Sequence, residues 1–547
     1  MQSFSEIDTT SKRASKAAGF SWGVAEEIGK SVRSLELFGL PGVINLNLYL
    51  KKIKRNHPKK LNRIDKENKP NDKELCPIYS GVAFLDQCKK LETLQSIKFY
   101  NVSYPLLMLP FISRASELLG KKILIRYNNT SFLLNFDKSI FSQNIDKSKK
   151  LQFNVTFFVC SGLKGNFTVL TISDISIRPV SIPYKVPWRN RHTEEAGTPM
   201  THLRTSIIEI KTSDEITGLG EFRTDGLEGD AAADVASGIS DVALKKLNKI
   251  LVGENPTEIS RIIPILEREF GHGALVAGID FALHDIKGKS FGVPVYELLG
   301  GKTRDKVPLV WTLPYLSIEE QVLQATSRVS EGFVHAVKMK VGIPGDTEHL
   351  LAVARSIKGI PIRPDSNMGH SKAEAIAQLT TLRREGVSLE LVEDPCPTNF
   401  DDFQEIGDLF DLQISIHGGW SSFSDLSTII RAGKSRVGCV NIMTTYWGLY
   451  RSAQIVGALE TAGIGWTLGT SHDSSIKISA ALHLATAMPN RIYPCDLLGP
   501  LLHVDDLASA PLQIHSGYGV APDKPGLGID LDEDVMSRWS VDASVRH

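Results

Sequence analysis

The chain has 547 residues, of which 42% are hydrophobic and 23% are charged. This length exceeds what one hydrophobic core usually organises, so we expect two or three domains, and the composition excludes a disordered or fibrous protein. Lys plus Arg and Asp plus Glu both total 62, which leaves the whole chain without an electrostatic basis for binding nucleic acid or a membrane surface.

Cysteine usage and apolar runs indicate a cytoplasmic protein. The six cysteines are scattered without a C-x-x-C pair, which argues against a disulfide framework or a zinc cluster. The N-terminus lacks the apolar segment of a signal peptide. The longest apolar run, residues 104–112, is interrupted by Pro105 and Pro110, so we predict no membrane span.

Residues 1–168 are predicted to form a separate N-terminal domain. Residues 5–50 have a helical pattern, and residues 51–74 are rich in Lys, Asn and Pro, which is typical of a solvated linker. A basic arm for nucleic acid is the alternative, but no aromatic residues are interleaved with the cations. The stretches "KKILIRYNN" and "FNVTFFVC" predict strands of a small α+β domain, without a recognisable chemical motif.

The rest of the chain divides into two further parts. Residues 169–304 begin with strands and continue as helices, among them a helix over residues 274–292, and we expect residues 500–547 to complete this α+β domain. Residues 305–499 alternate short β-branched runs with amphipathic helices. That alternation predicts repeated βα units around a parallel sheet, as in a (β/α) barrel.

Each short apolar run of this third part ends in a polar or reactive residue. Successive strand ends are separated by 24 to 31 residues, about one strand, one helix and two loops. In a (β/α)8 barrel the carboxyl ends of the strands converge on one face, where the active sites of such barrels lie. The strand-end residues are Lys338, Lys340, Asp365, Asn367, Glu393, His417, Asn441, His472 and Asp496.

These residue types suit chemistry next to a carboxylate. Asp365 and Glu393, on adjacent strands, are hard oxygen ligands for Mg2+ or Mn2+. Such a cation would stabilise the ene-diolate formed when an α-proton leaves. Lys340, beside Lys338 and the cation, would act as the base, with His472 on the opposite side of the barrel. The structural alternative is that the lysines are ordinary strand-end residues and the acids are helix N-caps.

His417 follows the strand "DLQISI" and has three possible roles. A histidine at such a place is a core residue, a base or a metal ligand. Its spacing from Glu393, in phase with Asp365, favours a third metal ligand. If His417 instead points at substrate, a water must fill the third position of the metal.

Further residues are candidates for lining the substrate pocket. Asn367 and Asn441 follow strands, and Trp311 and Tyr315 lie at the end of the first barrel strand, where core packing is the alternative. His192 lies in the loop "WRNRHTEEAGTPMTHLR" before the barrel, where solvation is the alternative.

Several motifs in this order resemble the enolase superfamily over residues 170–540. They are "VKMK", "RPDSN", "VEDP" and "GIDFALHDIKGKSFGVPVYELLGG". The stretches "YWG", "TSH", "YPCD" and "KPGLGIDLDED" are most similar to the glucarate dehydratase-like subgroup. The resemblance implies a TIM-like barrel with an α+β capping domain, a homo-oligomer and a magnesium-dependent reaction.

The same resemblance implies roles for single residues. Lys340 would be the base with Lys338 as its partner, Asp365 and Glu393 the metal ligands, and His472 the second acid or base. Asp496 matches an active-site aspartate of the subgroup, and His417 falls where the subgroup has an Asn. Met443 replaces the aspartate that orients the catalytic histidine in that subgroup.

The leading hypothesis is therefore a hydro-lyase that dehydrates a hydroxy-carboxylate such as an acid sugar, with no nucleic-acid or membrane partner. The first alternative is a racemase or epimerase using Lys340 and His472 on opposite faces of the substrate. The second is a catalytically weakened binding or regulatory protein. The N-terminal "AAGFSWGVAEEIGKSVRSL" with "GLPG" resembles an uncharacterised bacterial family, which implies a gene fusion.

Overall fold

The computed structural model divides the chain into two compact units, Met1–Phe167 and Thr168–His547. The residues that it describes are 4–37, 40, 42–53, 60–70, 74–94, 96–120, 123–127, 130–134, 140–143, 152–159, 170–223, 241–432, 436–489 and 492–541. Within these residues no helix is long and apolar enough to cross a membrane.

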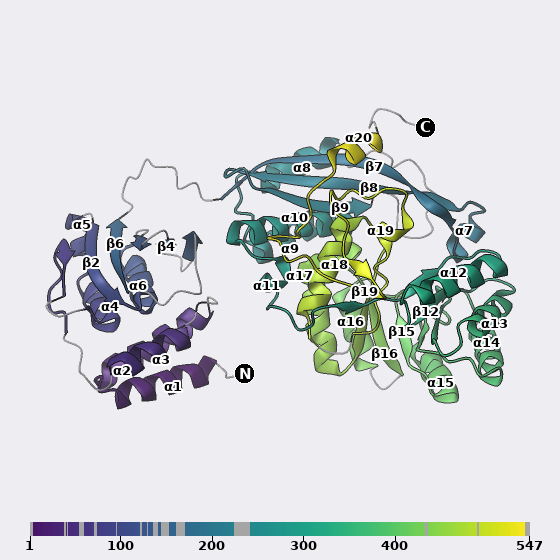
Figure 1. Cartoon of the computed structure of the whole chain (residues 1–547), viewed down its shortest axis with the longest axis horizontal. Helices are drawn as coiled ribbons and strands as arrows, with labels where there is room; N and C mark the ends of the chain where they lie inside the picture. Colours follow the sequence, from purple (N-terminus) through teal and green to yellow (C-terminus); the bar gives the residue numbers. More distant parts are fainter. Residues whose placement is uncertain are drawn as a thin grey trace. The chain divides into compact units, whose positions relative to one another are not determined.

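The N-terminal unit combines helices with a six-stranded sheet of order β1-β2-β6-β3-β4-β5 (Figure 1). Its helices are α1 (Phe4–Ala17), α2 (Trp22–Leu37), α3 (Gly42–Ile53), α4 (Pro77–Asp86), α5 (Lys90–Leu94) and α6 (Leu109–Leu119), with a 3-10 turn at Pro105–Met108. Its strands are β1 (Glu67–Asn68), β2 (Ser96–Ser103), β3 (Ile123–Tyr127), β4 (Thr130–Leu134), β5 (Ile140–Gln143) and β6 (Gln152–Val159).

Part of the segment predicted to be a solvated linker belongs to this core. Ile64 is 1% exposed, and Glu67 and Asn68 pair with β2. Burial of the apolar Ile64 side chain stabilises this position, and the pairing with β2 holds the adjacent backbone, despite the polar composition of the segment. Residues 54–59 and 71–73 of the same segment lie outside the described residues.

The second unit begins with a three-stranded antiparallel sheet of β7 (Ile172–Trp188), β8 (Met200–Thr212) and β9 (Thr217–Arg223). The helices α8 (Asp241–Leu251), α9 (Ile259–Phe270) and α10 (Ala274–Phe291) follow. β9 packs so closely on α10 that a Cβ at Gly220 would lie 1.9 Å from the carbonyl oxygen of Gly278. The end of the chain returns to β7, where Val180 bridges Ser540.

Seven parallel strands form the barrel in the order β11 to β17. They are β11 (Trp311–Leu313), β12 (Val337–Lys340), β13 (Ile362–Asp365), β14 (Val392–Glu393), β15 (Ile414–Ile416), β16 (Val437–Met443) and β17 (Gly465–Gly469). Parallel bridges from residues 492–495 to Trp466 and to Leu309 close the ring. The predicted TIM-like barrel with a capping sheet is confirmed.

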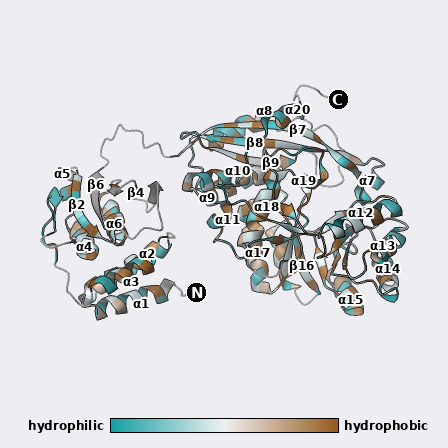
Figure 2. Ribbon diagram, in the orientation of Figure 1, coloured by the Kyte–Doolittle hydropathy of each residue, from teal (hydrophilic) through white to brown (hydrophobic). Residues whose placement is uncertain are grey.

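Helices connect the strands and cover the barrel. They are α12 (Ile318–Ser330), α13 (Asp346–Ser356), α14 (Lys372–Arg384), α15 (Phe400–Phe410), α16 (Phe423–Arg431), α17 (Thr444–Ala462) and α18 (Ser475–Ala487). They carry both hydrophobic and hydrophilic residues (Figure 2), as expected for helices with one buried face. α18 differs, because all of its residues are buried. This arrangement brings the strand ends of the barrel together beneath the capping sheet.

Candidate functional site

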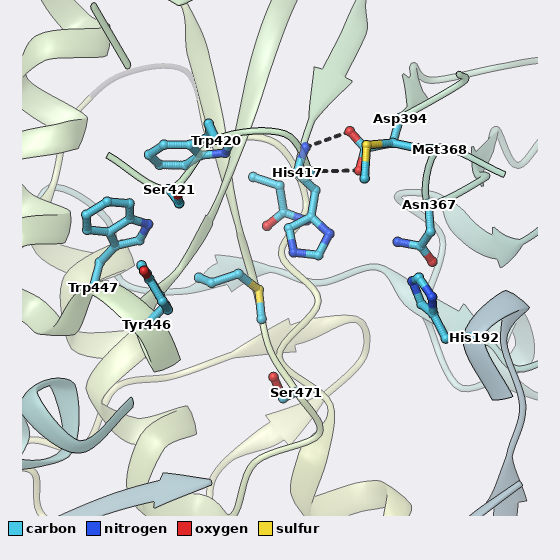
Figure 3. Close-up of a pocket in the computed structure, with 13 residues that line it drawn as sticks. His192, Asn367, Met368, Asp394, His417, Trp420, Ser421, Tyr446, Trp447 and Ser471 are labelled. Atoms are coloured by element: carbon cyan, nitrogen blue, oxygen red, sulfur yellow. Dashed lines mark hydrogen bonds between the residues drawn. The ribbon is translucent and has the colours of Figure 1, made fainter. Parts of the chain in front are cut away.

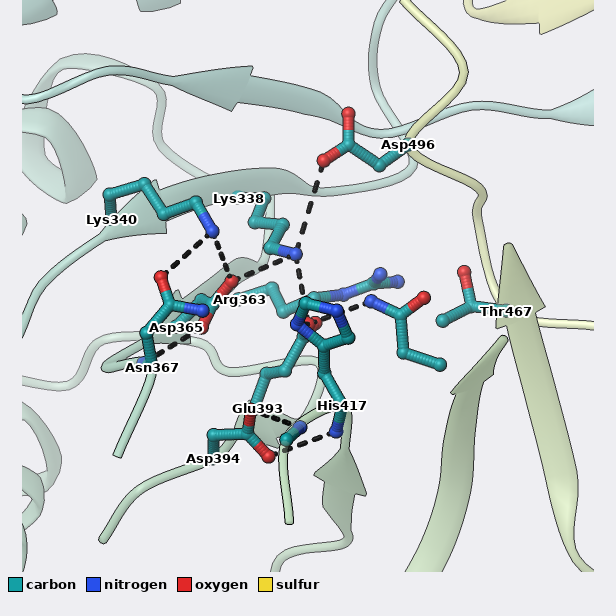
Figure 4. A network of polar contacts seen from close by, with 12 residues as sticks. Lys338, Lys340, Arg363, Asp365, Asn367, Glu393, Asp394, His417, Thr467 and Asp496 are labelled. Carbon is teal, nitrogen blue, oxygen red and sulfur yellow. Dashed lines mark hydrogen bonds and ion pairs between the residues drawn. The ribbon is translucent and has the colours of Figure 1, made fainter. Parts of the chain in front are cut away.

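Two lysines and two carboxylates from three consecutive strands meet at the mouth of the barrel (Figure 4). Lys338 Nζ lies 2.9 Å from Asp365 Oδ2 and 3.0 Å from Glu393 Oε1. Lys340 Nζ donates to Asp365 Oδ2 at 2.8 Å and to Asn367 Oδ1 at 3.0 Å. The strand registers explain this, because Lys340 pairs with Asp365 and Asp365 with Glu393.

Burial and mutual attraction set the charges of this cluster. Burial alone would lower the pKa of Lys338, but Asp365, Glu393 and Asp496 outweigh it and raise that pKa above its usual value. Burial acts in the opposite direction on Asp365, whose pKa the two lysines nevertheless hold below its usual value. Lys338 therefore remains an ammonium and Asp365 a carboxylate at neutral pH.

Asp496 lies at the edge of this cluster. Its Oδ2 is 3.9 Å from Lys338 Nζ, and burial raises the pKa of its carboxyl group. On the other side, Asn441 Nδ2 donates to Glu393 Oε1 at 2.8 Å. Asn441 therefore fixes the orientation of the Glu393 carboxylate.

The three predicted metal ligands lie near one another but are not arranged around a common point. His417 Nδ1 is 3.9 Å from Glu393 Oε1, and the Lys338 ammonium stands between Asp365 and Glu393. Among the described residues no three His, Cys, Asp or Glu side chains form a metal-holding group. Asp365 and Glu393 nevertheless suit Mg2+ or Mn2+ chemically, because carboxylate oxygens are the ligands these cations prefer. Glu393 Oε2 is buried without a hydrogen-bond partner among the described residues, so its lone pairs are available to a cation.

Asp394, which follows Glu393, supports the backbone. Its two carboxylate oxygens accept hydrogen bonds from the backbone N–H groups of His417 and Gly418 at 2.9 and 2.8 Å. Burial raises the pKa of Asp394 to about 6. This side chain holds the turn after β15 in place, and with it the imidazole of His417.

A cavity of about 260 Å³ opens next to this cluster (Figure 3). Asn367, Asn441 and His417 line it, together with His192 from α7 (Arg191–Glu195). An Asn190 capping box begins α7, and Arg191 donates to the carbonyl oxygen of Asn367 at 2.9 Å. The predicted loop before the barrel thus reaches the strand ends and forms one wall of the cavity.

His472 follows β17, and its imidazole packs against the capping sheet. It is half-buried, its Nδ1 lies 3.3 Å from the Tyr184 hydroxyl, and its ring centroid is 3.9 Å from that of Trp188. Burial first, and then the nearby cations, lower the pKa of His472 well below its usual value. The cavity is lined by the neighbouring Ser471 rather than by His472.

The loop that carries His472 is tied to the capping sheet. The carboxylate of Glu221 on β9 accepts from the backbone N–H of Ser474 at 3.1 Å and from its hydroxyl at 2.6 Å. Thr445 donates to Asp473 at 2.8 Å, and Lys477 lies 2.5 Å from the same carboxylate. The aspartate next to His472 therefore serves helix α18 and not the imidazole.

Trp311 and Tyr315, which were predicted to line the substrate pocket, are not among the described residues that line this cavity. Trp311 is 3% exposed and packs against Arg328, whose Cζ lies 4.0 Å from the ring centroid. It begins β11 and so lies below the mouth of the barrel. Tyr315 follows β11, but its ring stacks on His349 with centroids 4.8 Å apart. A role for either residue in substrate binding therefore stays a prediction, and in this structure both rings pack against neighbouring side chains.

The aromatic residues that do line the cavity are Trp420, Tyr446 and Trp447. None of them had been predicted as a site residue. Trp420 follows the His417 turn, and the other two begin α17 in the "YWG" stretch. The signal that could have found them is the position of both stretches directly after barrel strands.

Comparison with known proteins agrees with this architecture. Residues 181–300 match the family described as "Mandelate racemase / muconate lactonizing enzyme, N-terminal domain", and residues 320–535 match "Enolase C-terminal domain-like". These two matches support the predicted enolase superfamily for the C-terminal unit. Residues 2–77 match "Protein of unknown function (DUF3726)", which confirms the predicted fusion to an uncharacterised family.

Individual relatives correct the predicted subgroup. The chain is 29% identical over 352 residues to muconate cycloisomerase 1 of Rhodococcus opacus, covering 63% of this chain and 93% of that protein. It is 28% identical over 364 residues to N-succinyl-L-Arg/Lys racemase of Bacillus cereus, covering 65% and 95%. The crystal structure of that racemase aligns with a TM-score of 0.61 and 26% identity over 68% of this chain and 98% of the other. The glucarate dehydratase-like assignment was wrong, because single shared motifs do not separate subgroups with the same strand ends.

Proposed function

We propose that the C-terminal unit is a carboxylate isomerase of the racemase or epimerase type, in which Lys340 exchanges the proton on the carbon next to a substrate carboxylate. The contact that carries the proposal is that of Lys340 Nζ with both Asp365 and Asn367 at the mouth of the barrel. Asn367 also lines the cavity, so one hydrogen bond links the Lys340 ammonium to the cavity wall.

The two lysines would have different roles. The raised pKa of Lys338 keeps its ammonium charged, which suits attraction of a substrate carboxylate and of the negative charge that develops on it. Lys340 donates to Asn367, which lines the cavity, whereas Lys338 contacts the buried carboxylates of Asp365 and Glu393. Proton transfer therefore falls to Lys340.

Asp365 and Glu393, with His417 as a third donor, would hold a Mg2+ or Mn2+ ion. When bound, such an ion supplies electrostatic stabilisation of an enolate on the substrate. The Lys338 ammonium must then leave its position between the two carboxylates. Its long, flexible side chain makes that movement possible without a change of backbone.

Isomerisation is favoured over the expected dehydration. Loss of water needs an acid to protonate the departing hydroxyl group, and His472 had been expected to provide it. Its lowered pKa leaves the imidazole neutral at pH 7, and the ring lies against Trp188 and Tyr184. The similarity to a racemase supports the same choice.

Inversion at a chiral carbon needs a second group on the opposite face of the substrate. With residues 492–495 as the eighth position of the ring, β12 faces β16, whose end carries Asn441 and Met443, neither of which titrates. His417, on the neighbouring β15, lines the cavity and is the candidate for that face when it does not bind metal.

The test is incubation of the full chain with Mg2+ and a panel of α-chiral carboxylates in D2O, followed by proton NMR and chiral chromatography. A racemase or epimerase incorporates deuterium at the α-carbon and yields the opposite configuration. A dehydratase instead yields a keto acid that semicarbazide traps. Formation of the keto acid without deuterium in recovered substrate would overturn the proposal.

A second candidate is cycloisomerisation, in which one carboxylate of an unsaturated acid adds to a double bond and a single acid protonates the adjacent carbon. The end of β16 carries no titratable side chain, which favours cycloisomerisation, because this reaction needs a single acid and Lys340 can provide it. In D2O it would give a lactone carrying one deuterium. A chiral acid would then show no inversion.

A further inference from the structure

We propose that Trp420, backed by Trp447 and Tyr446, forms an aromatic slot that binds a flat, uncharged substituent of the substrate, such as an aryl ring. The inference rests on the proposed function, since it identifies the class of carboxylate that the site accepts. The three side chains lie on one side of the cavity and His192, Asn367 and Asp394 on the other (Figure 3).

The slot is a fixed surface. The rings of Trp420 and Trp447 are stacked, with centroids 5.2 Å apart and planes 17° apart. Tyr446 and Phe423 meet Trp447 edge-on at 5.1 and 5.8 Å. Trp447 is 6% exposed and therefore buried, whereas Trp420 is half-buried and lines the cavity. Trp420 thus presents ring surface to a ligand from a rigid support.

The backbone behind the slot is also constrained. Gly448 has φ +66°, and a Cβ there would lie 2.5 Å from Asp280 Oδ2. The same oxygen accepts the backbone N–H groups of Leu449 and Tyr450, the latter at 2.9 Å. Asp280 therefore caps the regular part of α17, which begins after Gly448. This contact fixes the backbone that carries Tyr446 and Trp447.

The distribution of charge argues for an uncharged substituent. Among the described residues that line the cavity, His192, Asp394 and His417 are the only ones of the types Asp, Glu, His, Lys and Arg. No Lys or Arg is among them, so a second carboxylate would find no ammonium or guanidinium beside the aromatic rings. Asp394 is 1% exposed and lies on the other side of the cavity from the aromatic rings (Figure 3), so it does not stand beside a distal ammonium at the rings.

The aromatic rings and the absence of Lys and Arg among the described lining residues make this cavity unsuited to a doubly charged substrate. A carboxylate at one end would meet the lysine cluster through Asn367, and an aryl group at the other end would stack on Trp420. A second charge at the aryl end would be desolvated without a partner, which costs affinity. The substrate class that follows is a monocarboxylic acid with an aromatic substituent.

The experiment is isothermal titration calorimetry of the full chain with Mg2+ and three matched acids: N-acetylphenylalanine, N-acetylglutamate and Nα-acetyllysine. The variants are Trp420→Ala, Trp420→Phe and, as a control in the N-terminal unit, the exposed Trp22→Ala. We expect N-acetylphenylalanine to bind about tenfold more tightly than the other two acids. Trp420→Ala should weaken it by about three- to tenfold, whereas Trp420→Phe and Trp22→Ala stay close to wild type.

Equal affinity for the three acids, equal weakening of all three by Trp420→Ala, or no binding of N-acetylphenylalanine would overturn the slot. Thermal unfolding of Trp420→Ala, with a midpoint equal to that of Trp420→Phe, shows that the variant is folded. Deuterium exchange is measured separately. Tight binding of N-acetylphenylalanine without deuterium exchange would support the aromatic slot and refute the isomerase function. Exchange that occurs only with the doubly charged acids would refute the aromatic slot alone.

Discussion

Lys338 and Glu393 form an ion pair at 3.0 Å with both side chains at most 3% exposed. A buried pair of this kind stabilises little by itself, but removal of one partner leaves an uncompensated buried charge. The pair therefore couples the stability of the barrel to the same groups that we propose for catalysis.

The variant Lys338→Met tests that coupling. Loss of the ammonium should lower the free energy of unfolding of the C-terminal unit by about 3–5 kcal/mol in the absence of divalent cations. Urea denaturation followed by circular dichroism measures it, with the exposed Lys358→Met as the matched control. Adding Glu393→Gln to Lys338→Met should restore part of the loss. An unfolding transition like that of wild type in Lys338→Met would contradict the role of the pair.

Divalent cations should stabilise the C-terminal unit through Asp365 and Glu393. At a Mg2+ or Mn2+ concentration of roughly 100 times Kd, the expected gain is about 2.7 kcal/mol, seen as a rise in the thermal unfolding midpoint that EDTA reverses. Glu393→Gln should abolish the rise, and the exposed Glu348→Gln on α13 should keep it. Lys338→Met should respond to the cation at least as strongly as wild type, because its side chain no longer occupies the position between the carboxylates. A rise that survives in Glu393→Gln would place the cation elsewhere.

The position of the strand-end residues could be predicted from the sequence, because strand and helix periodicities fix where each βα unit ends. Lys340, Asp365 and Asn367 meet as their spacing suggested. The insertion of Lys338 between two carboxylates could not be foreseen, since it depends on side-chain conformation and on the absence of a third acid at His417.

The environment of His472 was equally beyond the sequence. Tyr184 and Trp188 come from a strand almost 300 residues earlier, and only the packing of the capping sheet over the barrel brings them to the imidazole. The same long-range packing decides that Trp420 faces the cavity and Trp311 does not. Local patterns carry no information on such pairs.

A buried histidine on α18 should make stability depend on pH. His483 accepts the backbone N–H of Tyr296 on Nδ1 at 3.3 Å, so its Nε2 carries the proton and donates to the carbonyl oxygen of Leu527 at 3.2 Å. Burial lowers the pKa of His483 from 6.5 to about 4. Between these values the unfolded chain binds a proton that the folded chain does not, so the stabilisation is complete above pH 6.5 and falls as the pH drops toward 4.

The expected loss over this range is about 3 kcal/mol, from the cost of each pKa unit. Thermal midpoints of wild type and His483→Gln, measured from pH 7.5 to 4.5, should converge as the pH falls. The exposed His515→Gln should follow wild type throughout. A constant difference between wild type and His483→Gln would show that His483 does not titrate in this range.

The most direct test of the proposed chemistry is the rate of α-deuterium incorporation by Lys340→Ala, with an acid that the wild-type chain exchanges in D2O in the presence of Mg2+. Removal of a general base typically lowers the rate by a factor of about 10²–10⁴, so the exchange rate of Lys340→Ala should fall at least about 100-fold. The control Lys358→Ala, which changes an exposed lysine, should retain the wild-type rate. Circular dichroism and the thermal midpoint establish that Lys340→Ala is folded. Exchange by folded Lys340→Ala at the wild-type rate would contradict the assignment of Lys340 as the base.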